Sequence, residues 1–71
     1  MEFLDQRVRE LIGIAAAVAG HCQPCFDYHL EQARKQGLSK IEIKATVKLA
    51  QAIRKAGDDN MDNYVQETIG R

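Results

Sequence analysis

The sequence lacks a surplus of either charge, because ten lysine and arginine residues balance ten aspartate and glutamate residues. A nucleic-acid-binding domain normally carries a basic excess, so this balance argues against that class of function. It also gives no reason to expect binding to a membrane surface or to a strongly acidic partner.

The sequence also lacks a long apolar run. A segment that crosses a bilayer needs about 18 consecutive apolar residues, and the apolar stretch from Leu11 to Gly20 is shorter. Asp5 and Glu10 are among the charged residues that precede it, whereas a secretory signal has a basic start and few acids. We therefore expect a cytoplasmic protein, in which two cysteines are more often catalytic or metal-binding than a permanent disulfide.

Strands, repeats, linkers and low-complexity segments are also lacking. Apolar residues instead recur at helical spacing along the whole chain. The sequence therefore predicts one compact all-α domain that spans residues 1–71. The expected helices are Phe3–Ala19, Cys22–Gly37, Lys40–Ala56 and a short last helix that begins after Gly57, at Asp58 and Asp59.

The second and third expected helices meet at Gly37, which predicts a central helix–Gly–helix hairpin. Ser39 followed by Glu42 is a capping-box pattern that marks the start of the third helix. We expect the third helix to bury one apolar stripe, formed by Ile41, Ala45, Leu49, Ala52, Ile53 and Ala56.

The apolar surface exceeds what a chain of 71 residues can bury by itself. From Leu11 onward the first expected helix has no polar side chain on any face, so it needs cover on all sides. A domain of this size buries only about 60% of the surface that its unfolded chain exposes. We therefore expect a homo-oligomer built from dimers.

The residues that can carry chemistry cluster at the start of the second expected helix. Cys22 and Cys25 lie in its first turn, where unpaired N–H groups stabilise a thiolate, and Pro24 is tolerated there. His29 follows Cys25 by one helical turn on the same face, so its imidazole can take the thiol proton. This arc predicts a thiol–disulfide centre that faces the core or a subunit contact.

Glu10, at the border of the apolar face of the first helix, can orient that imidazole or simply face solvent. Alternatives to the redox reading stay open at this point. The two cysteines can be small buried hydrophobic residues, and His29 can be a histidine of the core. A zinc site is a third alternative, because four side chains are of types that bind zinc: His21, Cys22, Cys25 and His29. Structural zinc sites, however, usually draw ligands from two separated segments. A thioredoxin-type fold would need strands that this sequence lacks.

The spacing of these groups resembles the redox members of the alkylhydroperoxidase D-like and carboxymuconolactone decarboxylase family. Their pattern is a glutamate, eleven residues, Cys-x-x-Cys, three residues and a histidine. Glu10, Cys22, Cys25 and His29 match all four places. The likeness extends from about Val8 to Ala56 and is fairly specific, because all four offsets are fixed.

The resemblance implies an alkylhydroperoxidase D-like fold, subunits that associate as dimers or as a hexamer, and a site near a subunit contact. The implied activity is antioxidant: reduction of alkyl hydroperoxides or hydrogen peroxide, or of disulfides. In the family pattern Cys25 attacks and Cys22 resolves, with His29 and Glu10 in support. Physical reasoning alone leaves this order open, since Cys22 is nearer the helix start. The implied partners are a small peroxide or disulfide substrate and a thiol reductant, with no cofactor or metal besides the Cys22–Cys25 disulfide.

Two features depart from the family pattern. Alkylhydroperoxidase D has a second histidine just before its second cysteine, where this chain has Pro24. Longer members also have additional helices that can form a substrate pocket. Two other functions therefore remain alternative predictions: a non-catalytic or metal-binding oligomeric module, and lactone decarboxylase chemistry, for which no arginine clamp is apparent.

Overall fold

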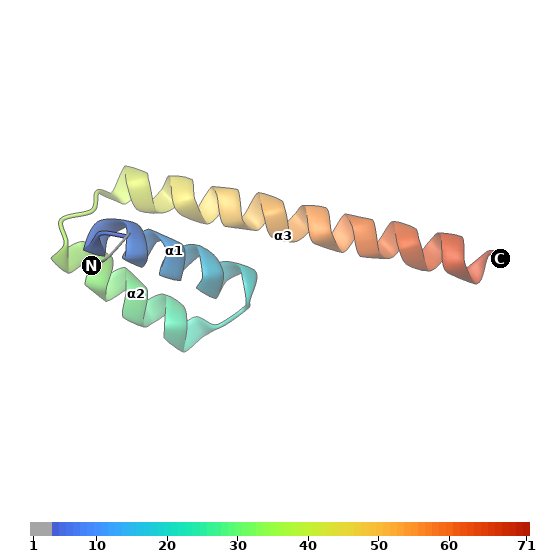
Figure 1. Ribbon diagram of the computed structural model, residues 1–71, viewed down its shortest axis with the longest axis horizontal. Helices are drawn as coiled ribbons and strands as arrows, with labels where there is room; N and C mark the ends of the chain where they lie inside the picture. The colour runs from blue at the N-terminus through green and yellow to red at the C-terminus, as the bar shows by residue number, and fades with distance from the viewer. Residues whose placement is uncertain (1–3) are drawn as a thin grey trace.

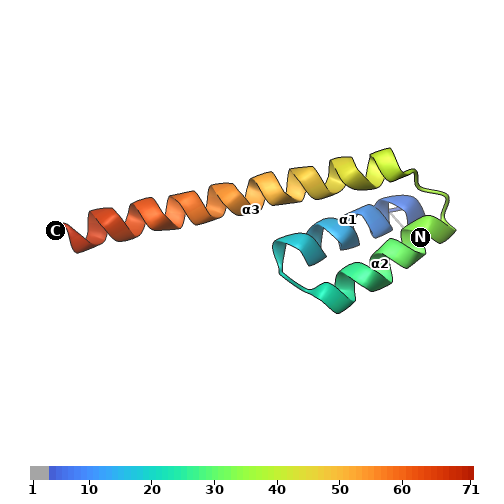
Figure 2. The ribbon, with the colours of Figure 1, turned by 180° about the vertical axis from the view of Figure 1, so that it is seen from behind.

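In the computed structural model, residues 4–71 are described, and they form three α-helices and no strand. The helices are α1 (Gln6–Ala19), α2 (Gln23–Lys35) and α3 (Lys40–Ile69). α1 lies between α2 and α3 and packs against both (Figures 1 and 2). The predicted all-α fold is confirmed, whereas the predicted helix start at Phe3 lies outside the described residues.

Side chains cap the starts of α1 and α3. The Asp5 carboxylate accepts a hydrogen bond from the Val8 N–H group at 2.9 Å. Ser39 and Glu42 form the predicted capping box, in which each side chain accepts from the backbone N–H of the other, at 3.1 and 3.0 Å. The Ser39 N–H and hydroxyl groups, and the Arg7 guanidinium, hold the pKa of Glu42 below its usual value.

The core is small and lies where α1 meets α2 and the first half of α3. Ile14 of α1 is fully buried there. Leu38 and Ile43 pack with it from the link after α2 and from α3, together with Ala33 of α2. Gly37 ends the turn after α2 at φ 78°, a left-handed conformation that favours glycine. The link at Gly37 joins α2 to α3, but the closely packed helix pairs are α1 with α2 and α1 with α3.

The prediction that Gly57 ends the third helix is wrong, because α3 continues without a break to Ile69. A glycine inside a helix costs only about 1 kcal/mol relative to alanine, which good helix formers on either side can offset. The ion pair between Lys55 Nζ and Asp59 Oδ2, at 2.9 Å, spans the glycine and raises the pKa of Lys55. The separate last helix therefore does not exist; its residues are the end of α3.

The predicted buried stripe of α3 is also wrong for the single chain. Ile41, Leu49 and Ile53 have exposed fractions of 80, 64 and 62%. The neighbouring stripe, with Ile43 and Ala50, faces the core instead. α3 is apolar on both sides here, so helical period alone did not decide which side faces α1.

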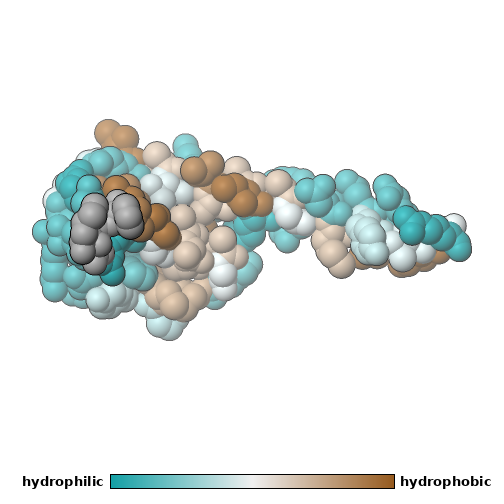
Figure 3. Space-filling view, viewed as in Figure 1, coloured by the Kyte–Doolittle hydropathy of each residue, from teal (hydrophilic) through white to brown (hydrophobic). Residues whose placement is uncertain are grey.

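The second half of α3 projects away from the other helices (Figure 1). The Cα radius of gyration is 15.6 Å, and the principal extents are 52 × 27 × 20 Å. A compact chain of this length would have a radius of gyration of about 11 Å. Apolar surface is visible along the first half of α3, whereas the projecting end is mostly hydrophilic in the same view (Figure 3). Within residues 4–71, no helix has both the length and the apolar character needed to cross a bilayer.

The Ser39→Ala substitution tests the cap of α3. It removes the acceptor for the Glu42 N–H group, and we expect the free energy of unfolding to fall by about 1 kcal/mol. For a domain of this size that corresponds to a melting temperature lower by roughly 4–8 °C. Ser39→Asp, which keeps an acceptor at the same place, is the matched control and should melt close to the wild type. Equal melting of Ser39→Ala and wild type would contradict the capping role.

The lowered pKa of Glu42 predicts an acid-dependent part of the stability. Because the folded pKa lies below the unfolded one, this stabilisation is present above the unfolded pKa and disappears as the pH falls through the folded pKa. Glu42→Gln should therefore melt below the wild type at pH 7 and approach it in acid. Thermal melts of both proteins from pH 7 to pH 2 measure this; a constant difference across that range would show that the charge of Glu42 does not contribute.

Candidate active site

The turn between α1 and α2 places the two cysteines. α1 ends at Ala19, and His21 adopts a left-handed φ of 58° that reverses the chain. The Cys22 N–H group donates to the Ala17 carbonyl at 2.9 Å. Arg54 of α3 donates to the Val18 carbonyl, also at 2.9 Å. This carbonyl lies in the last turn of α1, where carbonyl groups have no hydrogen-bond partner within the helix. The start of α2 is therefore fixed to the end of α1, which Arg54 in turn joins to α3.

Cys22 and Cys25 form a disulfide across the first turn of α2. Their Cα atoms are 5.3 Å apart, within the range that a disulfide requires. Cys22 is the N-cap residue of α2, and its Sγ accepts a hydrogen bond from the Cys25 N–H group at 3.3 Å. Cys22 is half-buried, whereas Cys25 is exposed. The sequence predicts that both sulfurs face the core or a subunit contact; Cys25 does not face the core of the single chain, so for this sulfur the subunit contact stays a prediction.

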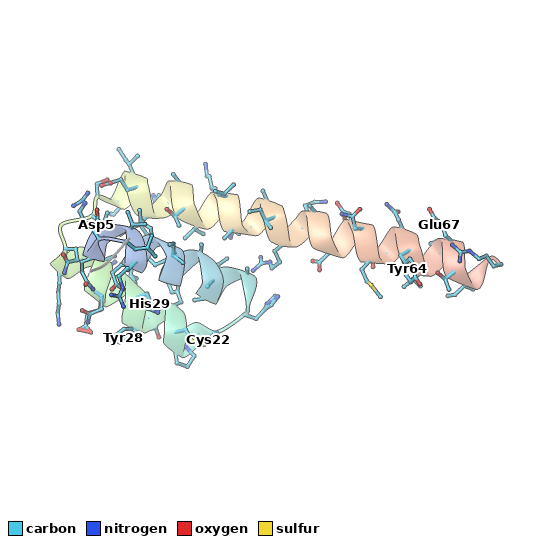
Figure 4. All side chains as sticks on the ribbon, in the orientation of Figure 1. Asp5, Cys22, Tyr28, His29, Tyr64 and Glu67 are labelled. Atoms are coloured by element: carbon cyan, nitrogen blue, oxygen red, sulfur yellow. A yellow bond between two sulfur atoms is a disulfide. The ribbon has the colours of Figure 1, made fainter. Side chains whose placement is uncertain are left out.

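Glu10 and His29 meet between α1 and α2. His29 projects from α2 toward α1 (Figure 4), and its Nδ1 lies 2.8 Å from Glu10 Oε1. Glu10 is buried, with an exposed fraction of 5%, and an ionised carboxylate can only accept hydrogen bonds. Beside an ionised Glu10, Nδ1 donates this hydrogen bond, and in the neutral imidazole Nε2 then keeps its lone pair. The structure brings these two predicted residues together; their catalytic use stays a prediction.

Two residues that the sequence analysis missed complete this contact. Gln6 Nε2 donates to Glu10 Oε2 at 2.9 Å, so both carboxylate oxygens have partners. Gly13 lies beneath the imidazole: a Cβ atom placed on it would come within 2.5 Å of His29 Cγ and Nδ1. A glycine inside a predicted helix, three residues after the candidate glutamate, was the signal that could have identified this position.

Separate cavities adjoin the two parts of the site. A cavity of about 360 Å³ lies beside His29 and is lined by Leu4, Gln6, Arg9, Glu10, Ile12, Gly13, Tyr28 and His29. Another, of about 440 Å³, lies beside Cys22 and extends to Phe26, Val47 and Arg54. No residue lines both cavities, so the His29 imidazole and Cys22 adjoin different cavities.

The four side chains of the zinc alternative do not converge. Within the described part of the chain, no group of three or more His, Cys, Asp and Glu side chains is placed to hold a metal ion. His21 lies in the turn before α2, and both cysteines are in the disulfide. In this structure the segment forms a disulfide turn.

The Gly13→Ala substitution tests whether Gly13 positions His29. The added methyl group cannot coexist with the ring in its present place, so we expect the Glu10–His29 hydrogen bond to break. The ¹⁵N chemical shifts of the imidazole should then change from those of a single Nδ1–H form to a mixture of tautomers. His21, which has no such partner among the described residues, provides an internal reference in the same spectrum.

Gly57→Ala is the matched control, because a Cβ atom there meets nothing within 4 Å. Both substitutions gain the intrinsic preference of alanine for helix, about 1 kcal/mol. Gly57→Ala should therefore raise the melting temperature, whereas Gly13→Ala should lower it. If both proteins gain stability equally and His29 keeps its spectrum, the imidazole does not pack on Gly13.

A comparison with known protein families covers the segment that carries the candidate site. The family model of the carboxymuconolactone decarboxylase family matches residues 2–59, which is most of the chain and includes every residue of the candidate site. No curated protein matches the chain, and no solved structure does so.

Proposed function

This chain belongs to the carboxymuconolactone decarboxylase family, and we propose that it is a thiol-dependent oxidoreductase that reduces small peroxides through Cys25 and Cys22. One observation carries the proposal: a histidine held by a buried glutamate lies one helical turn after a cysteine in a disulfide. This arrangement supplies a nucleophile, a proton acceptor and a fixed orientation for that acceptor.

In the proposed reaction the exposed Cys25 attacks first. Its thiolate bonds to one oxygen of the peroxide, and the O–O bond breaks. The leaving oxygen takes a proton and departs as an alcohol or as water, while Cys25 becomes a sulfenic acid. The Cys22 thiolate then attacks Cys25 Sγ, a hydroxide leaves and takes a proton to form water, and the disulfide results.

Cys22 is well placed for the resolving role. When reduced, its sulfur stays at the N-cap of α2, where the Cys25 N–H group and the helix dipole favour a thiolate. The same feature assists reduction of the disulfide. An external thiolate reaches the exposed Cys25 sulfur more readily than the half-buried Cys22 sulfur, and Cys22 leaves as the stabilised thiolate. Two equivalents of a thiol reductant, oxidised in turn to a disulfide, complete the cycle.

His29 acts as the base in this proposal. Its Nδ1 proton is directed to Glu10, so Nε2 can accept the Cys25 proton directly or through one water molecule. Side chains at positions i and i+4 of a helix are neighbours, which places the imidazole within reach of the first-turn sulfur. Glu10 makes no bond to substrate; it fixes the orientation of the ring.

Single-turnover reaction with hydrogen peroxide tests these roles. Cys22→Ser should still attack once and leave a sulfenic acid on Cys25 that a dimedone-type reagent traps. Cys25→Ser should give no trapped species, because the attacking sulfur is gone. A trapped species on Cys22 in Cys25→Ser, and none in Cys22→Ser, would reverse the order of the cysteines.

The same assay measures the support groups. His29→Ala should slow the reaction at neutral pH by a factor on the order of 10² to 10⁴, and high pH should restore part of the rate. Glu10→Gln should give a smaller loss. Glu31→Gln, which removes an exposed carboxylate from the same helix as His29, is the control and should react like the wild type. If the wild type reacts no faster than free cysteine, the protein is not a peroxidase of this kind.

A further inference from the structure

The second half of α3 has no cover within its own chain. All residues from Lys55 to Arg71 are exposed. The face that packs on α1, at Ile43, Val47, Ala50 and Arg54, nevertheless continues in phase along the helix. Alternating steps of three and four residues lead from Arg54 to Gly57, Met61, Tyr64 and Thr68. Tyr64 and Glu67 lie far from Cys22 and His29 on this projecting part (Figure 4).

An uncovered helix of this length needs a partner. Isolated helices shorter than about 12–15 residues are marginal in water, and most helical stability in proteins comes from packing one face. Met61, Tyr64 and Ile69 are exposed by 58, 57 and 79%, so no such packing is present in the single chain. The uncovered face of Gly57, Met61, Tyr64 and Thr68 therefore predicts a partner protein surface that lies alongside this half of α3.

A groove between α2 and the first half of α3 offers a matching surface. It has a volume of about 450 Å³ and an apolar floor of Phe26, Ile43 and Val47. Its rim is basic and consists of Arg34, Lys40, Lys44 and Lys48. The cavity beside Cys22 shares Phe26, Val47 and Gln51 with this groove, so the hollow continues as far as the disulfide.

The charges of α3 are divided between its two halves. The lysines that line the groove lie in the first half, whereas Asp58, Asp62 and Glu67 lie in the second. At 100° per residue, Lys44 and Asp62 have the same angular position on the helix, and Lys40 and Asp58 do so as well. No ion pair within residues 4–71 engages any of these three lysines and three acidic residues. On this side of α3, the lysines thus precede Arg54, and Asp58 and Asp62 follow it, while Lys55 is paired with Asp59.

We propose that the groove is filled by the second half of α3 from a second copy of this chain. The two α3 helices run antiparallel, with a twofold axis near Arg54. Each acidic half then lies along the lysine half of the other copy, and Met61 and Val65 cover the floor at Ile43 and Val47. A twofold interface is self-complementary, so every such contact occurs twice. The occupied groove adjoins the cavity beside Cys22, so the second copy also forms a wall near the disulfide.

Reversal of the charges tests this arrangement in the full-length protein, because all four altered side chains are exposed. One variant carries Lys44→Glu and Lys48→Glu, and the other carries Asp58→Lys and Asp62→Lys. Each variant alone places like charges opposite each other in both halves of the interface. Like-charge contacts at an interface disfavour association, so we expect dissociation constants raised at least about tenfold. Sedimentation equilibrium of the wild type should give a mass of at least twice 8.0 kDa.

Mixing the two variants gives the decisive result. One copy is then negative at all four altered or opposing positions, 44, 48, 58 and 62, and the other copy is positive at the same four, so both halves of a mixed dimer attract. The equimolar mixture should regain an affinity close to that of the wild type, as should the protein with all four substitutions. Lys35→Glu, a lysine change outside the groove, should leave association unchanged.

A monomeric wild type would overturn the proposal. So would association that is unaffected by the charge reversals, which would place the contact on another face, such as the exposed Val8 and Ile12 side of α1. Failure of the mixture to associate, when each variant alone has dissociated, would overturn the antiparallel order. None of these measurements depends on redox activity, so they stand apart from the test of the proposed function.

Discussion

The geometry of the rest of the site depends on the hydrogen bonds of one buried carboxylate, that of Glu10. Glu10 lies on the inner side of α1, where an unpaired charge would cost several kcal/mol. It is satisfied by Gln6 from its own helix and by His29 from α2. Among residues 4–71, every buried side-chain nitrogen and oxygen has a partner. The hydrogen bond from His29 helps to offset the free-energy cost of burying Glu10. The same hydrogen bond therefore also sets how α2 is rotated against α1 and how the imidazole is oriented.

That orientation has a steric condition as well as an electrostatic one. The imidazole can reach Glu10 only because Gly13 leaves the surface of α1 open beneath it. The glycine weakens α1 slightly, and the ring that packs in its place forms a hydrogen bond between two helices. At the other end of the site, Cys22 serves as the N-cap of α2. One sulfur atom thus both accepts a backbone hydrogen bond at the start of α2 and takes part in the disulfide.

The chain covers its apolar surface incompletely. α1 is well covered only where α2 and the first half of α3 contact it, and Ile12, Ile41 and Leu49 remain more than half exposed. A domain of this size has few buried large side chains, and here Ile14 is fully buried. The antiparallel pairing proposed for α3 would extend the core beyond what one chain can build. It would also place the disulfide at the border between two copies, which agrees with the expectation drawn from the family resemblance.

The sequence by itself determined the all-α class, the start of α3 at the capping box of Ser39 and Glu42, the turn at Gly37 after α2 and the residues that could form a redox centre. These features depend on local spacing and on side chains that hydrogen-bond within a few residues. It did not determine the side of α3 that faces the core, because Ile41 and Leu49 make a stripe as apolar as that of Ile43 and Val47. It also suggested a helix end at Gly57, where neighbouring side chains sustain the helix. Only the tertiary structure decided that Glu10 points inward and that Gly13 supports His29. These contacts join residues 16 to 19 positions apart, and their geometry follows from how α1 and α2 pack.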